Sequence, residues 1–169
     1  EEVAESSRSS GAESKVFGAN VADAKACQEL VKQVTAELGG LDILVNNAGI
    51  TKDGLVLRMK EEDWASVLDT NLSSAFYLSK AALRGMLRNN WGRVINISSV
   101  VGIMGNVGQA NYITAKAGLL GLTKALTAAP LGSRTVQVVC SRLLQPTGRF
   151  RRRSLSWVGS AKPISPCCV

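Results

Sequence analysis

Residues 96–124 read NISSVVGIMGNVGQANYITAKAGLLGLTK, and this stretch decides the predicted fold. The run at 94–97 has the length and apolar character of a buried strand. The residues from 112 to about 127 have the apolar spacing of a helix, and a glycine-containing loop joins the two. A strand followed by a helix in this way is the repeating unit of α/β proteins with a parallel sheet. We therefore predict an α/β fold.

The same stretch contains three candidate catalytic side chains. Tyr112 and Lys116 are four residues apart, so a helix places both on one face. An ammonium beside a phenol favours the ionised phenol, and such a pair can supply a proton at neutral pH. Ser99 ends the predicted strand, where open α/β sheets place reactive groups. The alternative is an exposed lysine beside a half-buried tyrosine, because so short a spacing also arises by chance.

Two further stretches strengthen the catalytic interpretation: LDILVNNAGIT at 41–51 and TNLSS at 70–74. Together with the block from Ser99 to Lys124, they resemble the short-chain dehydrogenase/reductase family, closest to its 3-oxoacyl-[acyl-carrier-protein] reductases. The resemblance covers about residues 12–139. It implies a Rossmann-like three-layer sandwich with a parallel sheet. We expect this fold to be incomplete, because no glycine-rich phosphate-binding turn precedes residue 15 and the first βα unit is missing.

The resemblance also implies a role for each catalytic candidate. Ser99 would polarise the substrate carbonyl, and Tyr112 would be the general acid. Lys116 would assist Tyr112 and hold the nicotinamide ribose, and Asn71 would position a water in the proton relay. Asn71 falls inside a predicted helix, where asparagine is mildly unfavourable. A local misfit of this kind is typical of a functional position.

Cofactor contacts follow from the resemblance in the same way. The predicted cofactor-binding residues are Asn20, Val21, Asn47, Ala48, Gly49, Tyr112 and Lys116. The first two would contact the adenine, and the segment at 47–49 would line the path of the adenosine and nicotinamide. From the residues alone, Asn20 could equally form an Asx turn before a helix, and 46–49 could be a plain turn. The preference for NADP(H) comes from the reductase subgroup, since the residues that would read the ribose 2′ position are not found.

The chain at 60–88 has a long helical pattern whose apolar residues spread over more than one stripe. A second apolar face suggests a partner. The resemblance implies a homodimer or homotetramer that forms through this helix and the helix at 112–127. The alternative is a helix buried only against its own sheet.

Composition excludes several kinds of protein. The 169-residue chain has no histidine, which excludes Ser-His-Asp and Cys-His catalysis and removes the usual zinc patterns. Its four cysteines show no disulfide framework, so we expect a reducing compartment. No apolar run reaches the length of a membrane span, and we predict no membrane association. The length fits one domain.

Charge divides the chain into two parts. All 13 acidic side chains lie in residues 1–140, whereas 141–169 carry six basic side chains and no acidic one. We predict a partial Rossmann-like reductase domain at 1–140 and a basic, disordered tail at 141–169, where the resemblance stops. A frame shift or alternative exon near Cys140 would explain this change. Nucleic-acid binding by the tail is the weaker interpretation, since a short arginine cluster has no partner-specific content.

The predicted function is NADPH-dependent reduction of a 3-oxoacyl-[acyl-carrier-protein] to its 3-hydroxyacyl form in fatty-acid biosynthesis. The substrate would be linked to acyl carrier protein. The alternative is a catalytically inactive reductase fragment that acts at most as a dimerisation partner. We expect a cytoplasmic location, or a plastid or mitochondrial matrix if an upstream transit segment was removed.

Overall fold

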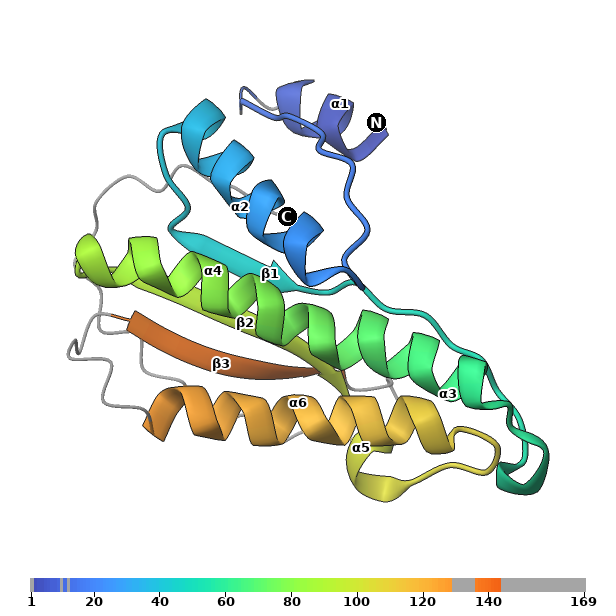
Figure 1. The fold of residues 1–169 in the computed structure, drawn as a ribbon. Coiled ribbons are helices and arrows are strands. Elements are labelled where there is room, and N and C mark those ends of the chain that lie inside the picture. The colour runs from blue at the N-terminus through green and yellow to red at the C-terminus, as the bar shows by residue number, and fades with distance from the viewer. Residues whose placement is uncertain (1, 10, 12, 129–135, 144–169) are drawn as a thin grey trace.

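The computed structural model describes residues 2–9, 11, 13–128 and 136–143, and its centre is a three-stranded sheet (Figure 1). The strands are β1 (Ile43–Asn46), β2 (Gly92–Ser99) and β3 (Val136–Leu143), in the order β1-β2-β3. Both pairings are parallel, with Ile43 opposite Arg93 and Gly92 opposite Val136. The predicted α/β fold with a parallel sheet is therefore confirmed.

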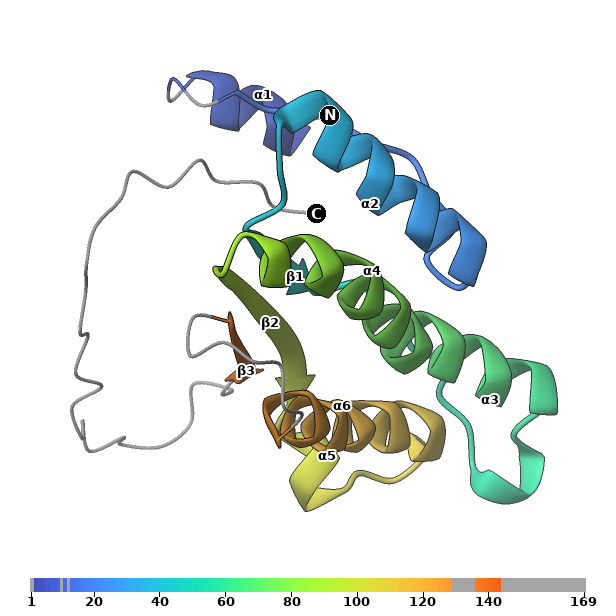
Figure 2. The same ribbon diagram turned by 60° about the vertical axis from the view of Figure 1, so that its left-hand side comes forward.

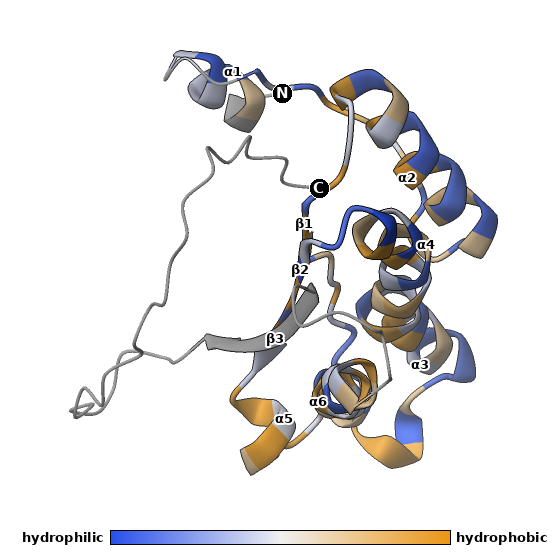
Figure 3. Cartoon of the chain, turned by 90° about the vertical axis from the view of Figure 1, so that its left-hand side faces the viewer, coloured by the Kyte–Doolittle hydropathy of each residue, from blue (hydrophilic) through white to orange (hydrophobic). Residues whose placement is uncertain are grey.

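Three long helices cover one face of this sheet, as the view along its edge shows (Figure 3). They are α2 (Ala24–Leu38), α4 (Ser74–Arg88) and α6 (Ala110–Ala128). Helix α2 packs on α4, and α6 packs on β2 and β3 (Figure 2). Helix α1 (Glu2–Ser9) lies beyond α2, and the short α5 (Val101–Met104) follows β2 directly. Among the described residues, no helix is long and apolar enough to cross a membrane.

Helix α2 begins after an N-cap, Asp23, and ends at a glycine, Gly39. The Asp23 carboxylate accepts hydrogen bonds from the backbone N–H groups of Lys25 and Ala26 at 2.7 and 2.8 Å, as an N-cap does. These bonds hold the pKa of the Asp23 carboxyl below its ordinary value. Gly39 ends the helix with φ 78°, in the left-handed region that glycine tolerates.

The hydrophobic core lies between this helical layer and the sheet. Its buried members come from α2, α4, the strands β1 and β2 and the turn before β1: Cys27, Leu30, Val31, Val34, Leu41, Leu44, Leu78, Ala82, Leu83, Met86 and Val94. Burial, and to a smaller degree the nearby Asp23 charge, raises the pKa of the Cys27 thiol. That thiol is therefore a core group rather than a reactive one.

The helix predicted at 60–88 is interrupted in a way that its pattern does not reveal. Helix α3 (Glu61–Leu68) passes into a π-helical segment, Asp69–Ser73, before α4 begins. The whole stretch remains one continuous rod in Figure 1. Single π turns inside α-helices occur frequently at functional sites, and this one contains Asn71.

The amino-terminal part differs from what its residues alone suggest. Residues 15–17 include the apolar pair Val16-Phe17, which is typical of a short strand, but they have no strand pairing, because no neighbouring strand lies beside them in the described residues. Residues 2–9 form the regular helix α1, although a serine-rich segment is a poor helix interior. At the other end, β3 continues to Leu143, past the predicted domain boundary at 140. Most of the predicted tail, 144–169, lies outside the described residues.

Candidate active site

Lys116 is fastened to β2 at two points. Its Nζ donates a 2.7 Å hydrogen bond to the Ile97 carbonyl, and its own carbonyl accepts a 2.7 Å bond from the Ser98 hydroxyl. The residue is only 5% exposed. Lysine is rarely buried without partners, so these bonds fix the ammonium near the carboxyl end of the strand. An exposed lysine, the alternative interpretation of the Tyr-x-x-x-Lys spacing, is therefore wrong.

Tyr112 lies one helical turn before Lys116 and is half-buried. The Lys116 Nζ is 5.6 Å from the centroid of the Tyr112 ring. At this distance an ammonium interacts favourably with the ring and with a charge on its oxygen. The helix therefore brings together the phenol and the ammonium that the sequence pairs.

Ser99 is the last residue of β2, two residues beyond the carbonyl that Lys116 contacts. Its Oγ accepts a long hydrogen bond, 3.4 Å, from the Val101 backbone N–H at the start of α5. A bond of this length is weak, which leaves the hydroxyl able to donate to a ligand. Ser99 and Lys116 thus meet at the same strand end.

Asn71 is buried in the π-helical segment, with 2% of its surface exposed. Its Oδ1 accepts a hydrogen bond from the Ile50 N–H at 2.8 Å, and its Nδ2 donates to the Ile50 carbonyl at 2.9 Å. Helix α6 approaches this segment closely, because a Cβ on Gly118 would lie 2.6 Å from Leu72 Cδ2. The structure therefore places Asn71 beside the helix that contains Tyr112 and Lys116.

The predicted cofactor residues lie around the carboxyl edge of the sheet. Asn47, Ala48 and Gly49 follow β1 and are exposed. A Cβ on Gly49 would stand 3.4 Å from Asn71 Oδ1, in ordinary contact, so this segment lies against the Asn71 amide. Such an exposed backbone, with few side chains, suits a flat ligand.

Asn20 and Val21 precede α2, which runs back toward the start of β1. The Asn20 Oδ1 accepts a hydrogen bond from the Ala22 N–H at 3.1 Å. The Asx turn expected from the residues alone is thus present. The turn does not test the adenine contact of Asn20 and Val21, which stays a prediction.

Sequence reasoning did not single out a buried amide chain beneath the site. Asn46 Nδ2 donates to Asn96 Oδ1 at 2.8 Å and to the Ser79 hydroxyl at 3.2 Å, and Asn96 Nδ2 donates to Thr123 Oγ1 at 2.9 Å. These bonds join β1, β2, α4 and α6. Asn46, the last residue of β1, thereby ties this strand to its neighbour β2. The polar Asn96 inside an apolar strand was the available signal.

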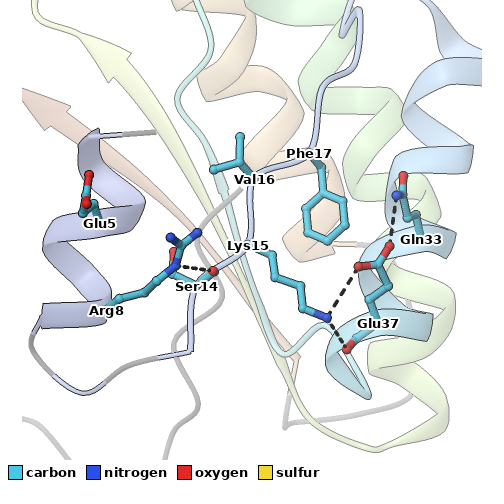
Figure 4. Close-up of a pocket in the computed structure, with 8 residues that line it drawn as sticks. All are labelled: Glu5, Arg8, Ser14, Lys15, Val16, Phe17, Gln33 and Glu37. Carbon is cyan, nitrogen blue, oxygen red and sulfur yellow. Dashed lines mark hydrogen bonds and ion pairs between the residues drawn. The ribbon is translucent and has the colours of Figure 1, made fainter.

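A separate hollow of about 520 Å³ lies between α1, the segment at 14–17 and α2 (Figure 4). The residues that line it are Glu5, Arg8, Ser14, Lys15, Val16, Phe17, Gln33 and Glu37. None of them is a predicted site residue. Across the described residues, no group of three cysteines or carboxylates is placed to hold a metal ion.

Comparison with known proteins identifies the family. The model of the short chain dehydrogenase family matches residues 1–147. The chain belongs to this family. Three relatives carry the name 3-oxoacyl-[acyl-carrier-protein] reductase FabG. The Vibrio cholerae protein is 53% identical over 128 residues, which are 76% of this chain and 52% of the relative. The Escherichia coli K12 protein is 50% identical over 137 residues, 80% of this chain and 56% of the relative.

The Staphylococcus aureus Mu50 protein is 49% identical over 138 residues, 82% of this chain and 56% of the relative. This short-chain dehydrogenase therefore spans about half the length of the curated relatives it matches. Its family membership and its likeness to 3-oxoacyl-[acyl-carrier-protein] reductases agree with the resemblance drawn from the motifs. The individual roles of Asn71, Ser99, Tyr112 and Lys116 stay predictions.

Proposed function

We propose that this short-chain dehydrogenase catalyses the NADPH-dependent reduction of a 3-oxoacyl-[acyl-carrier-protein] to the 3-hydroxyacyl form in fatty-acid biosynthesis. One observation carries the proposal: the buried Lys116 ammonium is fixed between the end of β2 and the Tyr112 ring. The reductases at about 50% identity supply the reaction class and the substrate.

The reacting carbonyl would lie between Ser99 and Tyr112. The Ser99 hydroxyl would donate a hydrogen bond to the carbonyl oxygen, and the Tyr112 phenol would give that oxygen its proton. Lys116 would stabilise the phenolate that remains, because its ammonium is 5.6 Å from the ring centroid. Bound NADPH would supply the hydride to the ketone carbon.

Asn71 would serve the proton relay through its placement. The oxygen and the nitrogen of its side-chain amide are both bonded to the Ile50 backbone. A water beside Asn71 would therefore be held mainly by the main chain of Asn71. Ile50 directly follows the segment proposed to line the nicotinamide path. Asn71 would therefore shape the cofactor side of the site as well as the relay.

The nicotinamide cofactor would rest on the exposed segment Asn47, Ala48 and Gly49, and Lys116 would contact its ribose. Asn20 and Val21 would contact the adenine. The exposed position of residues 47–49 directly after β1 supports this placement of the cofactor. NADP(H), rather than NAD(H), is proposed from the reductase relatives.

A homodimer or homotetramer is part of this proposal. Phe76 on α4 and Trp64 on α3 are 45% and 39% exposed, and the Lys80 ammonium lies 5.8 Å from the Phe76 ring. Aromatic residues of this kind are enriched at interfaces.

The proposed location is the cytoplasm, or a plastid or mitochondrial matrix.

The test is reduction of a short 3-oxoacyl thioester by the purified 169-residue chain, with NADPH and NADH titrated in parallel. The chain has two tyrosines, which provides a matched pair of variants. Tyr112→Phe should lower kcat by about 10²–10⁴-fold, the range for loss of a general acid, whereas Tyr77→Phe should keep it. A folded chain with neither turnover nor cofactor binding would refute the proposal and favour the inactive dimerisation partner.

A further inference from the structure

The segment at 50–54 connects two parts of the candidate site. At its beginning, the Ile50 N–H and carbonyl are both bonded to the Asn71 amide. At its end, the Gly54 N–H donates a 2.7 Å bond to the Gly108 carbonyl, and Gly54 pairs with Gln109 in a parallel bridge. The segment therefore runs from the π-helical segment to the start of α6.

Asn111, the residue directly before Tyr112, contacts the 50–54 segment. Its Nδ2 donates to the Lys52 carbonyl at 2.9 Å, with a longer bond of 3.4 Å to the Asp63 carbonyl. Its Oδ1 accepts a 2.7 Å bond from the Tyr112 N–H. Asn111 has no exposed surface. One side chain thus joins the 50–54 segment, α3 and the backbone of Tyr112.

The first turn of a helix has backbone N–H groups without intrahelical partners. Asn111 satisfies one of them, and it is the N–H of the proposed acid. An ordinary N-cap residue satisfies such a group from the position before the helix. Asn111 instead lies inside α6, and its amide nitrogen donates a hydrogen bond to a segment more than fifty residues away in sequence. This arrangement favours a role in placing Tyr112 over a role in starting the helix.

The segment that Asn111 contacts is held at both ends by hydrogen bonds of its backbone, to Asn71 at Ile50 and to Gly108 at Gly54. The exposed Lys52–Asp63 pair at 2.8 Å contributes little to this because water screens it. A shift of Tyr112 would have to break the bonds of Asn111 or carry this whole segment with it.

We propose that Asn111 is a positioning residue for Tyr112: it fastens the first turn of α6 to the 50–54 segment, whose other end Asn71 holds. The catalytic meaning of this inference rests on the proposed function, because only there is Tyr112 an acid. The position of Tyr112 can be measured without turnover. A failure of the proposed function therefore does not imply a failure of the positioning role, and the reverse also holds.

The experiment uses 3-fluorotyrosine and ¹⁹F NMR on the full chain in a Tyr77→Phe background, where Tyr112 gives the single signal. Asn111→Leu keeps the approximate shape of the side chain and removes its hydrogen bonds. The fluorine resonance should move at least halfway toward its position in urea. The Tyr112 amide should exchange its hydrogen about tenfold faster, as expected for loss of one hydrogen bond. Asn89→Leu, at an exposed asparagine after α4, is the matched control and should leave both readouts unchanged.

Asn111→Asp keeps an acceptor for the Tyr112 N–H but replaces the donor to the Lys52 carbonyl with an oxygen that this carbonyl repels. The fluorine resonance should therefore move as in Asn111→Leu, whereas amide exchange at Tyr112 should stay within about twofold of the parent. If the chain reduces the thioester, Asn111→Leu should lower kcat about tenfold with the KM for NADPH within twofold. An unmoved fluorine signal and unchanged amide exchange in folded Asn111→Leu would overturn the proposal. Loss of folding in both variants would also overturn it, since Asn111 would then act on the whole fold.

Discussion

Two polar regions of this molecule differ in how their side chains are held. At the carboxyl edge of the sheet, Asn71, Asn96, Asn111 and Lys116 are buried and bonded to named partners. In the hollow beside α2, the charged side chains are exposed, and Lys15 meets Glu37 at 3.5 Å. Burial of polar groups costs free energy unless their bonds are made. The buried, fully bonded polar groups lie at the candidate site, whereas those of the hollow are exposed to water.

The largest effect expected from this comparison is at Asn96. Asn96→Leu would remove the acceptor for Asn46 Nδ2 and the donor to Thr123. Because buried polar groups lose their partners, we expect the free energy of unfolding to fall by about 2–4 kcal/mol. Urea unfolding followed by circular dichroism measures it. The exposed Asn106 donates to the partly buried Gln109 within its own loop, and Asn106→Leu should change stability by less than about 0.5 kcal/mol. Equal losses of stability in Asn96→Leu and Asn106→Leu would contradict the difference between buried and exposed asparagines.

A smaller effect is expected where α5 passes close to α6. A Cβ on Gly102 would lie 3.0 Å from the backbone of Ala117 and of Lys116. Since backbone cannot yield as a side-chain tip can, Gly102→Ala should destabilise the protein by about 1–2 kcal/mol. Gly121, in α6 itself, has open space around it, and Gly121→Ala should stabilise by about 0.5–1 kcal/mol. Thermal unfolding of the two variants gives the comparison, and destabilisation by both would show that the close approach is not the cause.

In the hollow, the expected effect is near zero. Lys15 and Glu37 have side chains 39% and 40% exposed, and an exposed ion pair contributes little because water screens it. Lys15→Met should change the free energy of unfolding by less than about 0.5 kcal/mol. A loss above 1 kcal/mol in urea unfolding would mean that this region is as strongly held as the sheet edge.

The Asp23 cap of α2 is expected to have an effect that appears only at acid pH. The pKa of the Asp23 carboxyl is lowered by its bonds to the Lys25 and Ala26 N–H groups. Its contribution to stability is therefore present above the ordinary carboxyl pKa, and it is lost as the pH falls through the lower, folded value. Asp23→Asn keeps a cap without a titrating group, so the urea midpoints of parent and variant should converge or cross between pH 5 and pH 3. Parallel midpoints over that range would exclude this role.

Local patterns predicted much of this fold. Helix α2 could be placed from its Asp23 cap, its apolar stripe and Gly39, because each signal lies within the element itself. The strand at 94–97 and the pairing of Tyr112 with Lys116 followed from spacing in the same way. These predictions needed no knowledge of distant residues.

The remaining features depend on distant partners or on the hydrogen-bond register. The π-helical segment around Asn71 keeps an ordinary helical pattern of apolar residues, so periodicity could not reveal it. Residues 15–17 have the composition of a strand, but a strand also requires a neighbour. Asn111 reads as an ordinary polar residue beside Tyr112, and its importance appears only when Lys52 is brought against it.

The parallel order β1-β2-β3 also has a consequence for how the chain folds. No strand can pair with the next until a complete helical crossover has formed between them, and the bond from Asn46 to Asn96 spans 50 residues. Each such closure has an entropic cost before any pairing compensates for it. The helices can begin to form early from local contacts, whereas the sheet edge that carries the candidate site should be among the last parts to assemble.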